Sequence, residues 1–312
     1  MLLHEIPDFR DLIAVTAREH GIDPGLVEKD YWIMHALWGL QELGLTFELK
    51  GGTSLSKGYG LIHRFSEDID ILIHPDGTLP EGKNQNKPAQ VAARQLFYDD
   101  LAERIAIPGF QPALRDTEFD DVRYFRSAGI RLPYTELNPL PAGVKTGILL
   151  EAGFDQVAPN RPCLITSWAY EQAVASGLEG LTDNRAPDVL CYEPGYTLVE
   201  KLQTISTKYR MQQQSGQMPA NFMRHYYDVF CLLDASDVQA FIGTEAYHTH
   251  KKLRFRAADD PDITRNPAFL LSEPETRARY TRAYAGTRAL YYRDQPSLEA
   301  ILDRIGSNAS RL

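Results

Sequence analysis

The sequence predicts an α+β protein, in which a mixed α/β domain over residues 1–190 precedes a helical domain over residues 191–312. Two patterns support this division. Ile69, Ile71 and Ile73 alternate along a short segment, which is typical of a strand with one face in a core. After Pro194 the apolar residues recur mostly at helical spacing.

Residues 6–43 are predicted to form two helices, because Asp23 can cap the second helix and Pro24 suits its first turn. A strand, a glycine turn with a short helix, and the isoleucine strand follow, and together they predict a compact α/β unit. The remaining elements are expected as a strand over 46–50, a helical turn over 51–60, a helix over 89–105, strands over 121–126 and 145–153, and helices over 196–211, 221–233, 273–286 and 296–305.

Composition narrows the class of protein. The chain has 312 residues, of which 43% are hydrophobic, so it can bury a substantial core. No apolar run approaches the roughly 18 residues of a membrane span and the first residues carry acids, so a cytoplasmic location without membrane contact is expected. The three cysteines form no CxxC pair, which predicts neither a zinc site nor a disulfide framework. A net charge of −9 argues against uniform nucleic-acid binding, although an average can hide a local basic face.

The segment LKGGTSLSKGYGLIHRFSEDIDILI, residues 49–73, carries the chemistry. Asp68 and Asp70 share a strand parity, so their carboxylates are expected on one face, opposite the isoleucines. Two adjacent carboxylates favour a divalent cation, and Mg²⁺ binds a few carboxylates together with phosphate oxygens. The alternative is a solvated turn or a helix cap.

A glycine turn upstream of the two aspartates is expected to bind phosphate. Glycines let the backbone approach a phosphate closely, and hydroxyls beside them can reach phosphate oxygens. A phosphate cradle beside a carboxylate pair forms a minimal site for nucleotidyl transfer. Lys57 and Arg64 either neutralise phosphate or pair with Glu67 or Asp68. The candidate phosphate-binding residues are Gly51, Gly52, Thr53 and Ser54. The P-loop pattern GxxxxGK[ST] is absent, which disfavours a P-loop ATPase or kinase.

Glu151 is the best candidate for a third metal ligand, because it lies in the apolar segment KTGILLEAGF and two-metal transfer commonly uses a third acid. The prediction is therefore a site for Mg²⁺, with two ions possible, and an NTP. The alternative for Glu151 is a surface acid at the end of a strand.

These motifs resemble the AbiEii/AbiGii toxin family of type IV toxin–antitoxin systems. The resemblance also includes EKDYW (residues 28–32), EPGYTLVEKL (residues 193–202) and RHYYDVFCL (residues 224–232), in which His225 stands where an aspartate is more usual. It implies a polymerase-β-like nucleotidyltransferase fold whose helical domain completes the cleft for NTP and acceptor. It further implies an essential Ser66-x-Asp68 pair and required roles for Lys201 and Asp228.

The same resemblance implies an acceptor and a partner. Some members of the family attach nucleotides to the 3′ end of tRNA, and their partner antitoxin is a winged-helix repressor.

Two basic segments are candidates for RNA contact. Lys201, Lys208, Arg210 and Arg224 occur with interleaved tyrosines and without an acid from residue 201 to 227. This pattern suits a phosphate backbone or the triphosphate tail, and the alternative is a solvated helix face. For KKLRFR, residues 251–256, RNA contact and plain solubility are equally supported.

The leading hypothesis is therefore a toxin-type nucleotidyltransferase that uses an RNA acceptor. Two alternatives stay open at this point. One is transfer to a protein or a small molecule, and the other is a nucleotide-binding module without turnover.

Overall fold

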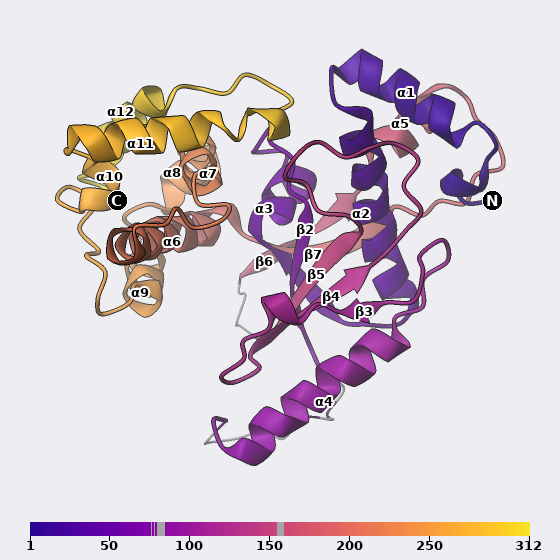
Figure 1. Ribbon diagram of the computed structural model, residues 1–312, viewed down its shortest axis with the longest axis horizontal. Helices are drawn as coiled ribbons and strands as arrows, with labels where there is room; N and C mark the ends of the chain where they lie inside the picture. Colours follow the sequence, from indigo (N-terminus) through magenta and orange to yellow (C-terminus); the bar gives the residue numbers. More distant parts are fainter. Residues whose placement is uncertain (76, 78, 80–84, 155–158) are drawn as a thin grey trace. The chain divides into compact units, whose positions relative to one another are not determined.

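A seven-stranded mixed sheet forms the centre of the first of two structural units (Figure 1). The computed structural model describes residues 1–75, 77, 79, 85–154 and 159–312. The first unit comprises Met1–Tyr59 and Phe65–Tyr192, and the second comprises Gly60–Arg64 and Glu193–Leu312. The sheet and its covering helices confirm the predicted α+β class.

The sheet has the strand order β3-β4-β5-β2-β1-β7-β6. Strand β2 is central, because it pairs antiparallel with β1 and parallel with β5. The strands are β1 (Phe47–Lys50), β2 (Asp68–Ile73), β3 (Leu114–Arg115), β4 (Ser127–Leu132), β5 (Ile148–Gly153), β6 (Asn160–Ile165) and β7 (Ala186–Tyr192).

Helix α2 (Pro24–Glu42) packs beside β5 and β7 and is the main helical support of the sheet (Figure 1). It begins as the sequence predicts, because the Asp23 side chain accepts a hydrogen bond from the Gly25 N–H and Pro24 occupies the first turn. Trp32 belongs to the buried core of this unit. The other helical segments of the first unit are η1 (Leu3–Glu5), α1 (Phe9–His20), α3 (Gly51–Thr53), η2 (Ser54–Gly58), α4 (Pro88–Arg104), η3 (Thr117–Phe119) and α5 (Trp168–Ala175).

The strand expected over residues 121–126 is wrong, because this segment is a turn and strand β4 begins only at Ser127. The Asp121 carboxylate accepts hydrogen bonds from the N–H groups of Arg123 and Arg126, and Phe125 has a positive φ of 47°. An aspartate that binds nearby backbone amides stabilises a turn in place of an extended chain.

The second unit is helical. Its longest helix is α6 (Pro194–Ser215), which packs against α7 (Arg224–Leu232), α8 (Ser236–Phe241) and α9 (Glu245–Arg254). The remaining helices are α10 (Pro267–Leu270), α11 (Pro274–Ala285), η4 (Arg288–Leu290) and α12 (Leu298–Asn308). Among the described residues, no helix has the length and apolar character needed to cross a membrane.

Residues 60–64 belong to the helical unit although they lie between β1 and β2 in the sequence. The Tyr292 N–H donates to the His63 carbonyl at 3.2 Å, and the Tyr292 hydroxyl donates to the Ile62 carbonyl at 3.0 Å. Arg64 forms a β-bridge with Tyr291. The chain therefore contributes a short segment to the second unit before it completes the first.

Candidate active site

Asp68 and Asp70 lie on the same face of strand β2. Both side chains are partly exposed, whereas Ile69 and Ile71, which alternate with them, are only 0% and 1% exposed. The isoleucines hold the strand in the core, so the two carboxylates project from the opposite face.

Glu151 joins this face from the neighbouring strand. In the parallel pairing of β2 with β5, the Cα partner of Asp70 is Glu151. Residues in register on adjacent strands project to the same side of a sheet, so Asp68, Asp70 and Glu151 share one surface. We call this surface the acidic face. Lys50 lies opposite Asp70 in the β1–β2 pairing and adds a cation to this surface.

The glycine turn abuts the carboxylates directly. Gly51 follows β1 with a φ of 72°, a conformation that side-chain-bearing residues rarely adopt. A Cβ atom at Gly51 would overlap Oδ2 of Asp70, so the missing side chain makes room for this carboxylate. The Thr53 hydroxyl donates to the Asp68 carbonyl at 2.5 Å and fastens the turn to β2.

The hydroxyls of Thr53 and Ser54 point inward. Both side chains are buried, and the Ser54 hydroxyl donates to the Tyr192 carbonyl at 3.5 Å. In this conformation the hydroxyls fasten the turn to the sheet, and their contact with a phosphate stays a prediction.

The helical segment after the glycines is irregular. Helix α3 continues into η2, a five-residue π-helix, and the Tyr59 N–H donates to the Ser54 carbonyl at 3.2 Å. Short π-helical segments occur frequently at functional sites.

A second cluster of charges lies within the helical unit, around Asp228 of α7. This carboxylate is 0% exposed and accepts two hydrogen bonds from Arg64, at 2.7 Å from Nε and 2.8 Å from Nη2. Lys201 Nζ of α6 lies 2.9 Å from Asp228 Oδ2. Burial works against the charged carboxylate, yet Arg64 and Lys201 hold the pKa of Asp228 well below its usual range.

The sequence matches the family described as the nucleotidyl transferase AbiEii toxin of type IV toxin–antitoxin systems, over residues 32–304. The chain belongs to the AbiEii family. It is therefore a nucleotidyltransferase of a toxin family, which implies a nucleotide substrate, a divalent metal and an antitoxin partner.

Comparison with solved structures finds similarity to the crystal structure of an antigenic nucleotidyltransferase-like protein from Paracoccidioides brasiliensis. The identity is 14% and the TM-score is 0.36, and the similarity covers 74% of this chain and 95% of that one. No curated protein sequence matches the chain.

The acidic face of this AbiEii chain suits a magnesium ion whose coordination shell is completed by the substrate. Within the described ranges, no three His, Cys, Asp or Glu side chains are arranged to hold a metal by themselves. Magnesium is usually held by one or two carboxylates, with waters and substrate phosphates in its other positions. Asp68 and Asp70 fit this requirement, and Glu151 lies in register beside Asp70.

Lys57 is not presented to the phosphate turn as expected. Its Nζ atom lies 2.8 Å from Oδ1 of Asp30 and 5.1 Å from the centre of the Trp168 ring. Asp30 is buried and also accepts a hydrogen bond from the Trp168 N–H. Because an isolated buried carboxylate is costly, Lys57 serves here as its counter-ion.

Three consecutive charged residues of α2, namely Glu28, Lys29 and Asp30, are buried and each fixes a different segment of the first unit. Glu28 accepts hydrogen bonds from the N–H groups of Leu137 at 2.9 Å and Asn138 at 2.8 Å. These bonds explain why the EKDYW motif carries charges in an otherwise apolar helix.

Lys29 supports the acidic face, although its sequence context predicts no role in the site. Its ammonium group donates to the carbonyls of Lys145 and Gly147, directly before β5. Glu67 accepts a hydrogen bond from the Lys145 N–H at 3.1 Å and fixes the same segment. Burial lowers the pKa of Lys29 to about 8, although the charges of Glu67 and Asp68 act in the opposite direction. The signal available in the sequence was an apolar helix that is interrupted by the charged residues EKD.

The proposed RNA-binding strip has internal partners. Lys208 Nζ donates to the Ala220 carbonyl at 3.0 Å, and Arg210 Nε lies 2.8 Å from Oδ1 of Asp259. Arg224 is buried. These contacts attach the cations to the helical unit, and the RNA contact expected for this strip stays a prediction.

His225 lies in the same unit with unpaired ring nitrogens. Both nitrogens are buried and have no hydrogen-bond partner among the described residues. Burial lowers the pKa of His225 well below its usual value, and Lys201 and Lys208 add to the effect. The imidazole is therefore neutral beside Asp228.

Proposed function

We propose that this AbiEii chain transfers a nucleoside monophosphate from an NTP to an RNA acceptor, the 3′ end of tRNA, in a Mg²⁺-dependent reaction. The observation that carries the proposal is the acidic face of Asp68, Asp70 and Glu151 beside the Gly51 turn. In the overall reaction an acceptor hydroxyl forms a bond to the α-phosphorus, the bond to pyrophosphate breaks, and the hydroxyl proton is released.

Each part of the face has a proposed role. Asp68 and Asp70 would hold magnesium, with Glu151 as a further ligand and room for a second ion. The metal would neutralise charge on the phosphates during transfer. The backbone of Gly51 and Gly52 would position the triphosphate, because no side chain blocks its approach.

Three further residues belong to the proposal. Ser66 is half-buried two residues before Asp68 and would contact the nucleotide. Lys201 and Asp228 would be required because they form one ion-paired cluster with Arg64.

The proposed partner is a winged-helix antitoxin encoded next to this chain. The support is the assignment of the family to type IV toxin–antitoxin systems. A neighbouring gene for a winged-helix repressor is the expected finding.

Labelled NTPs incubated with total RNA, protein and metabolites will test the transfer. Label is expected in RNA alone, and both Asp68→Asn and Asp70→Asn should lower it at least a hundredfold, because charge stabilisation is the main contribution to phosphoryl transfer. Glu48→Gln is a matched control, since Glu48 pairs with Leu72, which lies two residues beyond Asp70 on β2.

Two outcomes would reject the proposal. Incorporation that persists in both aspartate variants would remove these carboxylates from the chemistry. Label confined to protein or to a small molecule would retain a nucleotidyltransferase and reject the RNA acceptor.

A further inference from the structure

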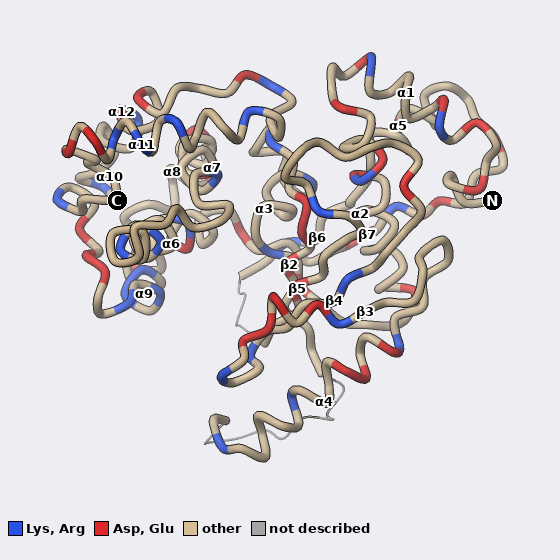
Figure 2. The backbone as a smooth tube through the Cα atoms, viewed as in Figure 1, with Lys and Arg blue, Asp and Glu red and all other residues tan. Residues whose placement is uncertain are grey.

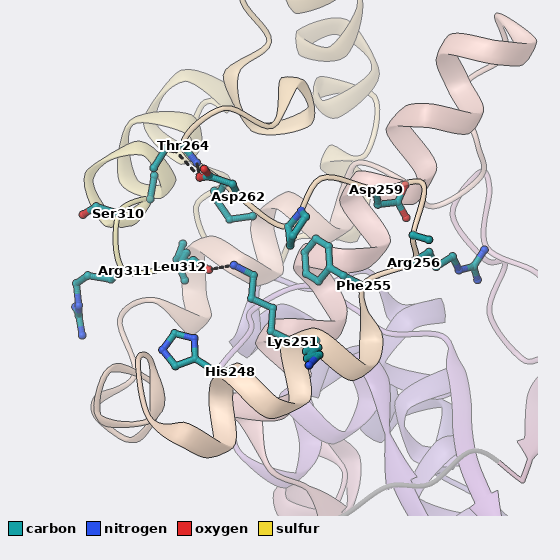
Figure 3. Close-up of a pocket in the computed structure, with 15 residues that line it drawn as sticks. His248, Lys251, Phe255, Arg256, Asp259, Asp262, Thr264, Ser310, Arg311 and Leu312 are labelled. Atoms are coloured by element: carbon teal, nitrogen blue, oxygen red, sulfur yellow. Dashed lines mark hydrogen bonds between the residues drawn. The ribbon is translucent and has the colours of Figure 1, made fainter.

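The helical unit contains a pocket that the proposed reaction does not use. Its volume is about 640 Å³, and it lies between the end of α9, the segment after it, and residues 309–312. Figure 2 shows basic residues along α9, and Figure 3 shows the pocket from close by. The lining includes Lys251, Lys252, Arg256 and Arg311, but only two acids, Asp259 and Asp262.

The acids of the pocket already have partners. Asp259 is buried and bonded by Arg210 at 2.8 Å, and it also accepts from the Thr207 hydroxyl at 2.5 Å. Asp262 accepts from the Thr264 hydroxyl at 2.6 Å. Arg210, which neutralises Asp259, is not itself part of the pocket lining. The cations of the lining therefore outnumber the acids that are left to balance them.

The cations of the pocket differ in whether they already form hydrogen bonds or ion pairs within the protein. Lys251 donates to the main-chain oxygen of Leu312, as the dashed line in Figure 3 shows. Arg311 donates to the side-chain oxygen of Gln239 at 2.6 Å. Lys252 and Arg256 are exposed, and in the part of the chain that the structure describes neither forms an ion pair. A third basic residue of α9, Arg254, lies 3.2 Å from Glu200 and is not part of the lining.

The arrangement suits an extended anion better than a compact one. In Figure 3, Arg256 and Arg311 lie at opposite ends of the pocket, with the Phe255 ring between them. Cations that are spread along a groove with an interposed aromatic ring are typical of single-stranded nucleic-acid sites, where phosphates meet the cations and bases stack on the ring. A single phosphate would need the cations to converge.

We infer that this pocket binds the sugar–phosphate backbone of the RNA acceptor, with Lys252 and Arg256 at phosphates and Phe255 stacked on a base. The inference rests on the proposed function for the identity of the ligand. It selects KKLRFR, and not the strip around Lys208, as the RNA-contacting segment of the helical unit.

Equilibrium binding of a fluorescent single-stranded RNA oligonucleotide, measured by anisotropy at several salt concentrations without NTP, will test the inference. Each lost phosphate contact lowers the slope of log K against log salt by about 0.7 on single strands. The double variant Lys252→Gln/Arg256→Gln should therefore reduce the slope by about 1.4 and weaken binding about tenfold at low salt. Both residues are exposed, so the fold should be retained.

Three further variants separate the components. Arg10→Gln/Arg18→Gln removes the same charge from exposed positions on α1 and should leave the slope unchanged. Lys252→Arg/Arg256→Lys keeps the charges and should bind as the wild type does. Phe255→Leu should weaken binding at least fivefold with an unchanged slope, because stacking releases no counter-ions.

The result can be interpreted whatever the transfer assay shows. A wild-type slope in Lys252→Gln/Arg256→Gln overturns the inference, even if RNA is labelled by the enzyme. An equal loss in Arg10→Gln/Arg18→Gln also overturns it, because the effect would then belong to net charge. A reduced slope together with no transfer to RNA would support the pocket and reject the RNA acceptor.

Discussion

Gly51 has an unusual backbone conformation and directly contacts the acidic face. Its φ of 72° excludes an ordinary side chain, and the space that a Cβ would take is filled by the Asp70 carboxylate. Parity in the sequence predicts that Asp68 and Asp70 share a face, and the structure agrees. The direct approach of the carboxylate to the glycine could not be predicted, because it depends on how β1 and β2 pair.

Gly51→Ala should therefore affect activity as well as stability. The left-handed backbone costs about 1–2 kcal/mol for alanine, and the Asp70 carboxylate must also rotate away from the new methyl group. We expect the nucleotide-transfer rate to fall about a hundredfold, which is the scale of a 1 Å misplacement in a positioned site. Steady-state transfer assays and chemical denaturation will measure the two effects.

Gly44→Ala is the matched control, because Gly44 has the same φ of 72° and no atom near its absent Cβ. It should lose similar stability and keep full activity. Equal loss of activity in the two variants would show that backbone strain alone accounts for the effect of Gly51→Ala.

Lys29 predicts a specific dependence of stability on pH. Its pKa is about 8 in the folded chain against an ordinary value of 10.5. The unfolded chain therefore binds more protons between these pH values, and stability should rise with pH across this window as the cost of the buried charge is relieved. The shift corresponds to about 3 kcal/mol in total.

Lys29→Met removes this titration, so the measurement is the difference in unfolding free energy between wild type and variant. Urea denaturation at pH 7.5, 8.5 and 9.5 should show the wild type gaining stability relative to Lys29→Met. A difference that does not change with pH would mean that Lys29 keeps its ordinary pKa in the folded chain.

The strands of the sheet show which elements the sequence predicts and which it does not. Alternating isoleucines located β2, and the apolar run before Glu151 located β5, because these strands are buried and their composition reflects it. The strand expected over 121–126 failed because one side chain, Asp121, redirects the local backbone. The strands over 160–165 and 186–192 were missed; their patterns of burial are irregular, and a bulge interrupts their pairing between Cys163 and Ile165.

The ion pair between Lys201 of α6 and Asp228 of α7 gives a prediction about how these two helices are held together. Asp228→Asn keeps the side-chain shape but leaves the buried charges of Arg64 and Lys201 without their counter-ion, which should cost about 3–5 kcal/mol. Asp303→Asn on the exposed side of α12 is the control and should change stability by less than about 0.5 kcal/mol.

The dependence of stability on acid pH gives a second test of Asp228, again by comparison of the wild type with Asp228→Asn. Because the folded-state pKa of Asp228 is lowered, its contribution is fully present above the unfolded value of about 4 and declines as the pH falls below it. The stability gap between wild type and Asp228→Asn should therefore narrow as the pH falls below about 4. A gap that stays constant down to pH 2.5 would indicate that Asp228 is not held in its charged form.

The order of the chain through its two units is the feature that sequence analysis could least predict. A boundary near residue 190 follows from a change in composition, but the assignment of residues 60–64 to the helical unit depends on contacts across 164 positions, such as that between Arg64 and Asp228. No local pattern encodes a pairing of this range. The motif that runs from Gly51 to Asp70 therefore serves two units, since its ends belong to the sheet and its middle to the helices.

This topology predicts that residues 193–312 are an incomplete folding unit. A fragment with this sequence lacks Arg64, so Asp228 keeps only Lys201 as a charged partner, and Tyr292 loses its hydrogen bonds to Ile62 and His63. We expect circular dichroism to show a weakly cooperative or absent thermal transition for the fragment. Asp228→Asn should then be neutral or stabilising in the fragment, whereas it costs about 3–5 kcal/mol in the whole chain, because a buried carboxylate is favourable only while its cations remain. A fragment that melts cooperatively and is destabilised by Asp228→Asn as strongly as the whole chain would show that residues 60–64 contribute nothing to the helical unit.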